Sequence, residues 1–196
     1  MMIRLTAALI AATALATPAL AQRVPAAQIA VVDLERVGRD CNACKTAGAA
    51  LQSQVNAFNT RRQQLTTQLQ PERQQLQAAI TALAGKDPDA ALRQRIQAFQ
   101  QKEANAAQEL ERQQTQIQRN QAYISQQVNA KLVPLLQPAM ERRGANVLMD
   151  TGAALRYGPA LDITNDVLTA LNAALTTVAT TAPAQTQTPQ QQPQGR

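Results

Sequence analysis

Apolar side chains recur at alternating spacings of four and three residues through the middle of this chain. The alternation runs from Leu51 to Leu83, and after a short break it continues from Leu92 to Ile124. Such spacing places one narrow apolar seam along each of two helices, which is typical of a coiled coil. The residues outside the seam are mostly Gln, Arg, Thr and Ala. We therefore expect two long helices whose remaining faces meet water.

The break between the two runs predicts the turn of a hairpin. Residues 85–89 read GKDPD, and an Asp-Pro pair close to a Gly is a turn signal. Two long helices joined by so short a turn must fold back antiparallel. The pairs that this register brings together are Leu76 with Phe99, Leu69 with Ala106, Leu65 with Leu110, and Phe58 with Ile117.

Polar residues interrupt the predicted seam. The same register sets Glu72 near Glu103 and Arg62 near Gln113, which weakens the middle of the arm. Pro71 has no backbone N–H to donate, so a helical hydrogen bond is missing and a kink is expected. The arm should therefore bend about Pro71.

The two flanks of the hairpin carry the apolar, β-branched runs that are typical of strands. Residues 29–32 (IAVV) and 147–149 (VLM) predict two strands, and residues 154–158 (ALRYG) a third, short one. A closing helix follows, with Asp162 or Thr164 as its N-cap. A body of about 60 residues is near the lower limit for an independent core, so we expect subunits to share one.

The first residues have the form of an export signal. Arg4 precedes an apolar run, residues 5–15, that is too short to span a membrane. Residues 19–21 (ALA) have the small-x-small form that signal peptidase accepts, so we expect cleavage after Ala21 and export to the periplasm. Loss of Arg4 lowers the net charge from +6 to +5. An uncleaved anchor helix is the alternative.

The composition argues against an enzyme. The chain has no His, which is the commonest general base and metal ligand, and its aromatic content is only 2%. We predict no catalytic residue, no cofactor and no metal site.

Cys41 and Cys44, the only two cysteines, lie between the first strand and the first long helix. In an oxidising compartment a local disulfide is the favoured interpretation. The alternatives are free thiols and a redox role, for which a C-x-x-C at a helix N-terminus is suited.

The flanks and the arm together resemble the Skp (OmpH-like) family of periplasmic chaperones. The resemblance rests on IAVVDLERV (29–37), NVLMD (146–150) and ALRYGPALDITNDVLTALN (154–172) in this order around the hairpin. It implies a homotrimer whose strands form a shared body, with three arms that enclose unfolded outer-membrane proteins without ATP. Pro71, the cysteines, the Gln-rich arms and the extra tail depart from the family pattern.

The expected fold is therefore α+β, with a small β-rich trimerisation body and a long antiparallel helical hairpin per subunit. The predicted parts are the signal peptide (1–21), the first part of the body (22–44), the arm (45–143), the second part of the body (144–175) and a disordered tail rich in Pro, Gln and Thr (176–196). We expect the shared body to involve Ile29, Val31, Val147, Leu148, Leu168 and Leu171.

The basic excess of the arm points to acidic partners. Residues 45–143 hold thirteen Lys and Arg against seven Asp and Glu. Outside the cell this favours acidic client segments or an anionic membrane surface over nucleic acid; a solvated helical face is the plain alternative. We predict a diffuse client-binding surface that includes Arg61, Arg62, Arg73, Arg93, Arg95, Lys102 and Arg112. The sequence thus predicts a holdase chaperone, and a coiled-coil scaffold of the cell envelope is the alternative.

Overall fold

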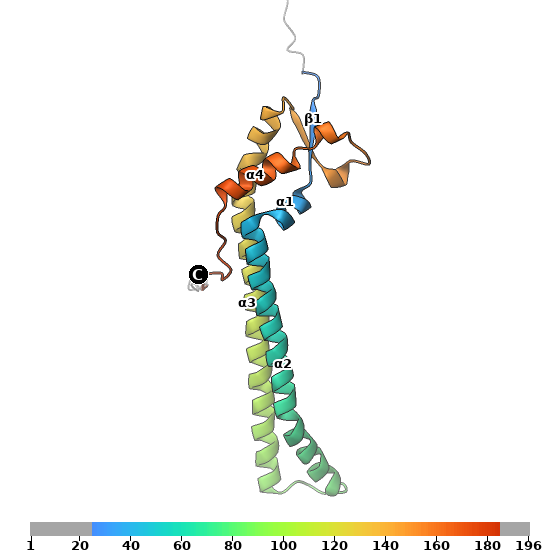
Figure 1. The fold of residues 1–196 in the computed structure, drawn as a ribbon. Coiled ribbons are helices and arrows are strands. Elements are labelled where there is room, and N and C mark those ends of the chain that lie inside the picture. The colour runs from blue at the N-terminus through green and yellow to red at the C-terminus, as the bar shows by residue number, and fades with distance from the viewer. Residues whose placement is uncertain (1–24, 185–196) are drawn as a thin grey trace, which may run out of the picture.

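The structure, a computed structural model, describes residues 25–184. Its elements follow the order β1 (Ile29–Val32), α1 (Leu34–Asp40), α2 (Asn42–Ala82), α3 (Ala90–Arg142), β2 (Val147–Asp150), the 3-10 turns η1 (Thr151–Ala153) and η2 (Pro159–Leu161), and α4 (Thr164–Ala174). A small body of strands and short helices stands at one end of a long two-helix arm (Figure 1). The predicted signal peptide lies outside the described residues. None of the helices between residues 25 and 184 combines the length and hydropathy that a membrane crossing requires.

The arm is the predicted antiparallel hairpin, formed by α2 and α3. Ala84 and Gly85 turn the chain with positive φ angles of 48° and 89°. Asp89 then caps α3, because its carboxylate accepts the Leu92 N–H at 2.7 Å. Both helices continue through their internal prolines, and α2 bends away from α3 toward the turn (Figure 1). The helical arm and the α+β class are confirmed.

The seam of the arm follows the predicted spacing over most of its length. Leu65, Leu76 and Phe99 are buried between the helices. At the predicted layer of Glu72 and Glu103, both glutamates are half-buried at the seam. Each pairs with a basic residue of the other helix: Lys102 Nζ lies 2.7 Å from Glu72, and Arg73 Nη2 lies 2.6 Å from Glu103.

Arg62 was expected in the seam, and this prediction is wrong. Its side chain is exposed, whereas the adjacent Arg61 is half-buried and bonds to Glu109 of the other helix. A helix has 3.6 residues per turn, so a step of three residues from Phe58 falls short of a full turn and a step of four overshoots it, on opposite sides of the seam line. Spacing alone could not choose between the two arginines.

The body is built on a two-stranded parallel sheet. β1 pairs with β2 in the register Ile29 to Val147 through Val32 to Asp150. The third strand predicted at residues 154–158 is not formed; the third segment beside β1 is a single bridge between Val31 and Asp162. The buried core of the body consists of Ala30, Val32, Val37, Cys41, Ala43, Val128, Leu132, Ala139, Ala145, Ile163, Val167, Leu171 and Leu175.

Two helix starts in the body were not predicted correctly. α1 was missed, although Asp33 is a regular N-cap whose carboxylate accepts the Arg36 N–H at 2.7 Å. α4 has Ile163 at its N-cap position, not Asp162 or Thr164. The Thr164 hydroxyl instead accepts the Asp33 N–H at 2.9 Å, so it joins α4 to the start of α1.

The chain after Leu175 was predicted to be disordered, and for residues 176–184 this is wrong. They form no helix or strand, but they follow the arm and bond to it (Figure 1). Composition predicts whether a segment can build a core of its own. It does not show that a neighbouring surface satisfies the main chain of that segment. Residues 185–196 lie outside the described residues.

Candidate binding surface

The outer faces of the arm are polar. Among the described residues, only Ile80 and Val133 are large apolar side chains that α2 and α3 leave exposed. The other exposed large apolar side chains lie in the body or its loops: Ile29, Leu34, Val147, Leu155, Tyr157 and Leu161. The arm therefore offers amides, guanidinium groups and small side chains, and the body offers the apolar surface.

The seven basic residues predicted to bind a partner fall into two groups. Arg61, Arg73 and Lys102 are engaged in ion pairs that join α2 to α3. The remaining four have no acidic partner within ion-pair distance in the described part of the chain: Arg62, Arg93, Arg95 and Arg112. All four are exposed, so their positive charge is available to a partner.

The pair of Arg61 and Glu109 has the best geometry of the arm. Arg61 donates from Nε at 2.6 Å and from Nη2 at 3.0 Å to the two carboxylate oxygens. These hydrogen bonds lower the pKa of Glu109 and raise the pKa of Arg61. Both groups remain charged at neutral pH, and the pair ties the helices together in the middle of the arm.

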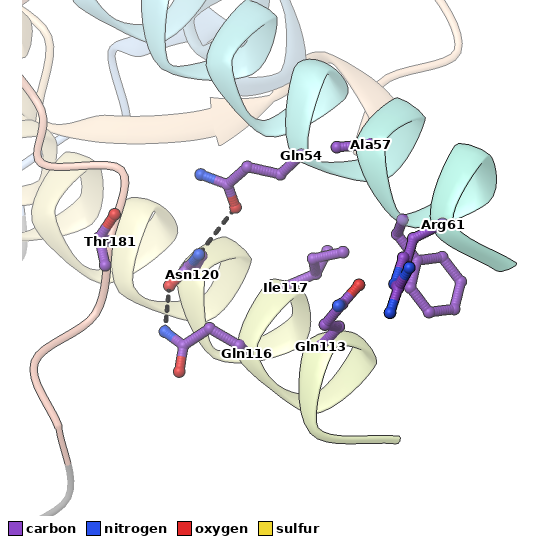
Figure 2. A pocket seen from close by; sticks show the side chains of 9 residues that line it. Gln54, Ala57, Arg61, Gln113, Gln116, Ile117, Asn120 and Thr181 are labelled. Carbon is purple, nitrogen blue, oxygen red and sulfur yellow. Dashed lines mark hydrogen bonds between the residues drawn. The ribbon is translucent and has the colours of Figure 1, made fainter. Parts of the chain in front are cut away.

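A groove opens between the helices on the body side of this pair. It has a volume of about 590 Å³. Its lining is formed by Gln54, Ala57, Phe58, Arg61, Gln113, Gln116, Ile117, Asn120 and Thr181 (Figure 2). Phe58 and Ile117, which the heptad register paired, supply its apolar part. Sequence reasoning missed the groove, because Thr181 comes from the tail.

Asn120 is the most deeply placed polar side chain of the groove, with 3% exposure. Its Nδ2 donates to Gln54 Oε1 at 2.7 Å, and its Oδ1 accepts from Gln116 Nε2 at 2.7 Å (Figure 2). The same Oδ1 accepts the Ala182 N–H at 2.8 Å. Three partners therefore hold this amide in one orientation, and one of them is the C-terminal segment.

The residues expected to form a shared body divide between the interior and the surface of this chain. Val31 and Leu171 are buried within this chain, and Leu148 and Leu168 are half-buried. Ile29 and Val147 are 40% and 37% exposed. Only the last two are thus directly available to another subunit.

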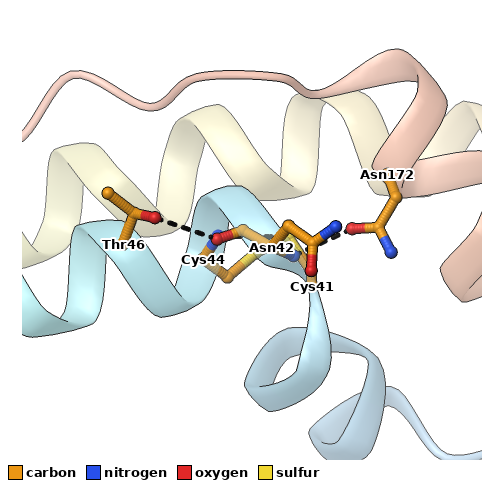
Figure 3. Close-up of a disulfide and its surroundings, with 5 residues drawn as sticks. All are labelled: Cys41, Asn42, Cys44, Thr46 and Asn172. Atoms are coloured by element: carbon orange, nitrogen blue, oxygen red, sulfur yellow. Dashed lines mark hydrogen bonds between the residues drawn. A yellow bond between two sulfur atoms is a disulfide. The ribbon is translucent and has the colours of Figure 1, made fainter.

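Cys41 and Cys44 are joined in a disulfide at the start of α2 (Figure 3). Cys41 is fully buried in the core of the body. The neighbouring Asn42 N–H donates to Asn172 Oδ1 of α4 at 2.8 Å, so the bridge sits where the arm meets the body. No group of three or more potential metal ligands occurs in the part of the chain that the structure describes.

The comparisons with known proteins bear on the whole of this arrangement. Residues 28–171 match the profile of the family described as Outer membrane protein (OmpH-like). The chain belongs to the OmpH-like family. The matched range begins at β1, includes the complete arm and ends in α4, so the OmpH-like unit consists of body and arm without residues 172–196.

A solved structure gives the same fold. The chain resembles a Caulobacter crescentus protein described as a candidate outer membrane chaperone (OmpH-like), with a TM-score of 0.67 and 21% sequence identity. The match covers 84% of this chain and 95% of the other. No curated protein sequence matched the chain. The Gln54, Asn120 and Gln127 side chains lie inside the OmpH-like range, whereas the segment they hold, residues 179–183, lies beyond it.

Proposed function

We propose that this protein is a periplasmic holdase that binds unfolded outer-membrane proteins between its arms, without ATP, and prevents their aggregation. Membership of the OmpH-like family and the fold of the Caulobacter chaperone candidate support a chaperone role. The observation that carries the proposal is that the long arm has a polar surface, whereas most of the exposed large apolar side chains lie on the body.

A polar arm suits the holding of unfolded chains. Any single contact to it is weak, because the described arm exposes only Ile80 and Val133 as large apolar groups. Many weak contacts within one enclosure keep a client at high local concentration without fixing its shape. Such binding prevents aggregation and leaves the client able to fold after release.

An enclosure requires several arms, and we propose a homotrimer that joins through the body. The parallel pair β1–β2 has only two strands, which is too small a sheet to be stable alone. Ile29 and Val147 lie exposed on it, and Leu155 in the loop after η1 is fully exposed. Burial of this apolar surface between subunits would supply the missing stability.

The free arginines of the arm add attraction for acidic segments. Arg62, Arg93, Arg95 and Arg112 are exposed without an ion-pair partner in the described chain. Their attraction for a client is screened over ~8 Å at physiological ionic strength. The charge should therefore increase the capture of acidic clients and matter less once contacts are close.

Export to the periplasm fits the disulfide. A disulfide such as the one between Cys41 and Cys44 persists in an oxidising compartment. The export signal proposed for residues 1–21 would deliver the chain to one. Suppression of the aggregation of a urea-unfolded outer-membrane barrel protein, in the absence of nucleotide, tests the proposed function.

A further inference from the structure

Residues 179–183 lie on the arm and are held there through their main chain. Gln127 makes two bonds to Ala179, from its Nε2 to the carbonyl at 2.9 Å and from the Ala179 N–H to its Oε1 at 3.0 Å. Gln54 Nε2 donates to the Thr180 carbonyl at 3.2 Å. The Ala182 N–H donates to Asn120 Oδ1 at 2.8 Å, and Arg119 donates to the Pro183 carbonyl.

The spacing of these side chains matches that of an extended polypeptide. Asn120 and Gln127 are seven residues apart on α3, which corresponds to about 10.5 Å along a helix. Their partners, Ala182 and Ala179, are three residues apart, which corresponds to about 10 Å along an extended chain. Two amide side chains that are two turns apart on α3 are therefore spaced like two residues that are three apart in an extended chain. The bound segment runs antiparallel to α3.

The contacts do not depend on the side chains of the bound segment. Its residues are small, and no hydrogen bond within residues 25–184 involves the hydroxyls of Thr180 or Thr181. Figure 2 shows Thr181 on the segment that passes beside Asn120 at the edge of the groove. A different sequence without bulky side chains would find the same donors and acceptors.

The arm side of this contact is pre-organised. Asn120 is buried and fixed by Gln54 and Gln116. Gln127 also donates to the Tyr123 carbonyl of its own helix at 3.1 Å. Amides that are already oriented lose little side-chain freedom when a peptide binds.

We propose that Gln54, Asn120 and Gln127 form a recognition site for the main chain of an extended polypeptide, which residues 179–183 occupy in the resting protein and from which an unfolded client segment displaces them. The inference deepens the proposed function and rests on it for the nature of the client. A tethered occupant has a high effective concentration, so only a client that offers many contacts at once displaces it.

Paired substitutions in the full-length protein separate the occupant from the site. Ala179→Pro with Ala182→Pro removes the two N–H donors of the segment and leaves the arm intact. Gln127→Met removes both bonds to Ala179 with little change in side-chain size. Thr180→Ala with Thr181→Ala keeps every main-chain contact and is the matched control.

The probe is a fluorescent peptide that copies residues 176–184 (TTVATTAPA), and its binding is measured by anisotropy. We expect the double proline variant to bind it at least about tenfold more tightly than the wild type or the threonine control, as two released hydrogen bonds imply. Gln127→Met added to the proline variant should remove that gain. A peptide whose other residues are scrambled but whose proline keeps its place should bind equally, and a peptide N-methylated at the two alanines that copy Ala179 and Ala182 should not bind.

Equal binding of the probe by the wild type and the proline variant would overturn the inference, as would undiminished binding of the N-methylated peptide. A urea-unfolded barrel protein should displace the peptide from the proline variant. Peptide binding that the barrel protein does not displace also overturns the inference. In contrast, failure of every variant, the wild type included, to keep the barrel protein soluble contradicts the proposed function.

Discussion

Ile29 and Val147 face each other as register partners at the start of the parallel ladder, and both side chains are exposed, at 40% and 37%. Parallel strands are usually covered on both faces. An exposed apolar pair on a two-stranded parallel sheet is therefore a surface that another subunit is expected to cover.

Val147→Asp should dissociate the protein, because it would place an unpaired charge in the proposed interface. Light scattering at micromolar concentration should return a trimer for the wild type and a smaller mass for the variant. Ile80→Asp is the matched control, since Ile80 is equally exposed, at 42%, but lies near the tip of the arm. A monomeric wild type, or a trimer that survives Val147→Asp, would count against the shared body.

The register of the arm can be tested by cross-linking. With Cys41 and Cys44 replaced by serine, Leu69→Cys with Ala106→Cys should form a disulfide within one chain, because these positions line the same depression between the helices. Leu69→Cys with Ile124→Cys should not cross-link within one chain. The reverse result would refute the antiparallel register.

Glu109 should make the arm sensitive to acid. Its hydrogen bonds from Arg61 hold its pKa in the folded protein below the ordinary value. The unfolded chain then binds more protons below about pH 4.3, so the free energy of unfolding falls as the pH drops toward the folded-state pKa. Stability from this pair is present at neutral pH and is lost in acid.

Glu109→Gln should lower the midpoint of thermal unfolding slightly at pH 7, since a pair that solvent reaches is screened. The difference from the wild type should shrink as the pH falls below 4. Glu111→Gln on the exposed face of the same helix is the control, as Glu111 has no ion pair in the described structure. A difference that stays constant with pH would exclude a role for the ionised carboxylate.

The free arginines should govern the salt dependence of client binding. Replacing Arg62, Arg93, Arg95 and Arg112 together by Gln should weaken the binding of an acidic unfolded client at low salt and flatten its dependence on salt. Each single replacement should have only a small effect. Loss of binding from one of the single replacements would indicate a discrete pocket instead of a diffuse surface.

The hairpin could be predicted from the sequence because its stabilising pattern is local. A seam at alternating spacings of four and three residues, together with one turn signal, determines the helices, their direction and most of their facing pairs. The pattern could not place the charges, since Arg61 and Arg62, three and four residues after Phe58, fall on opposite sides of the seam line. Long side chains such as Lys102 also reach beyond their own position in the heptad.

The C-terminal segment could not be predicted, because its order comes from partners far away in the sequence. Ala179 is bound by Gln127, and Ala182 by Asn120. A segment of Thr, Ala and Pro carries no signal for such contacts. The arm has many glutamines, which could have indicated a peptide-binding surface. Because they are polar, they were expected to be in contact with water. Asp162 is a second example, because its single bridge to the distant Val31 stands where a third strand was expected.

The central claim is that the arms hold an unfolded barrel protein in solution. The most direct test is the light scattered by a urea-unfolded outer-membrane barrel protein on dilution into buffer without nucleotide. The control is an arm shortened by deletion of residues 62–75 together with 100–113, which removes two heptads from each helix in register. We predict that the full-length protein suppresses the scattering at about one trimer per client and that the shortened protein, still trimeric, does not. Equal scattering with and without the full-length protein, or full protection by the shortened arm, would contradict this account.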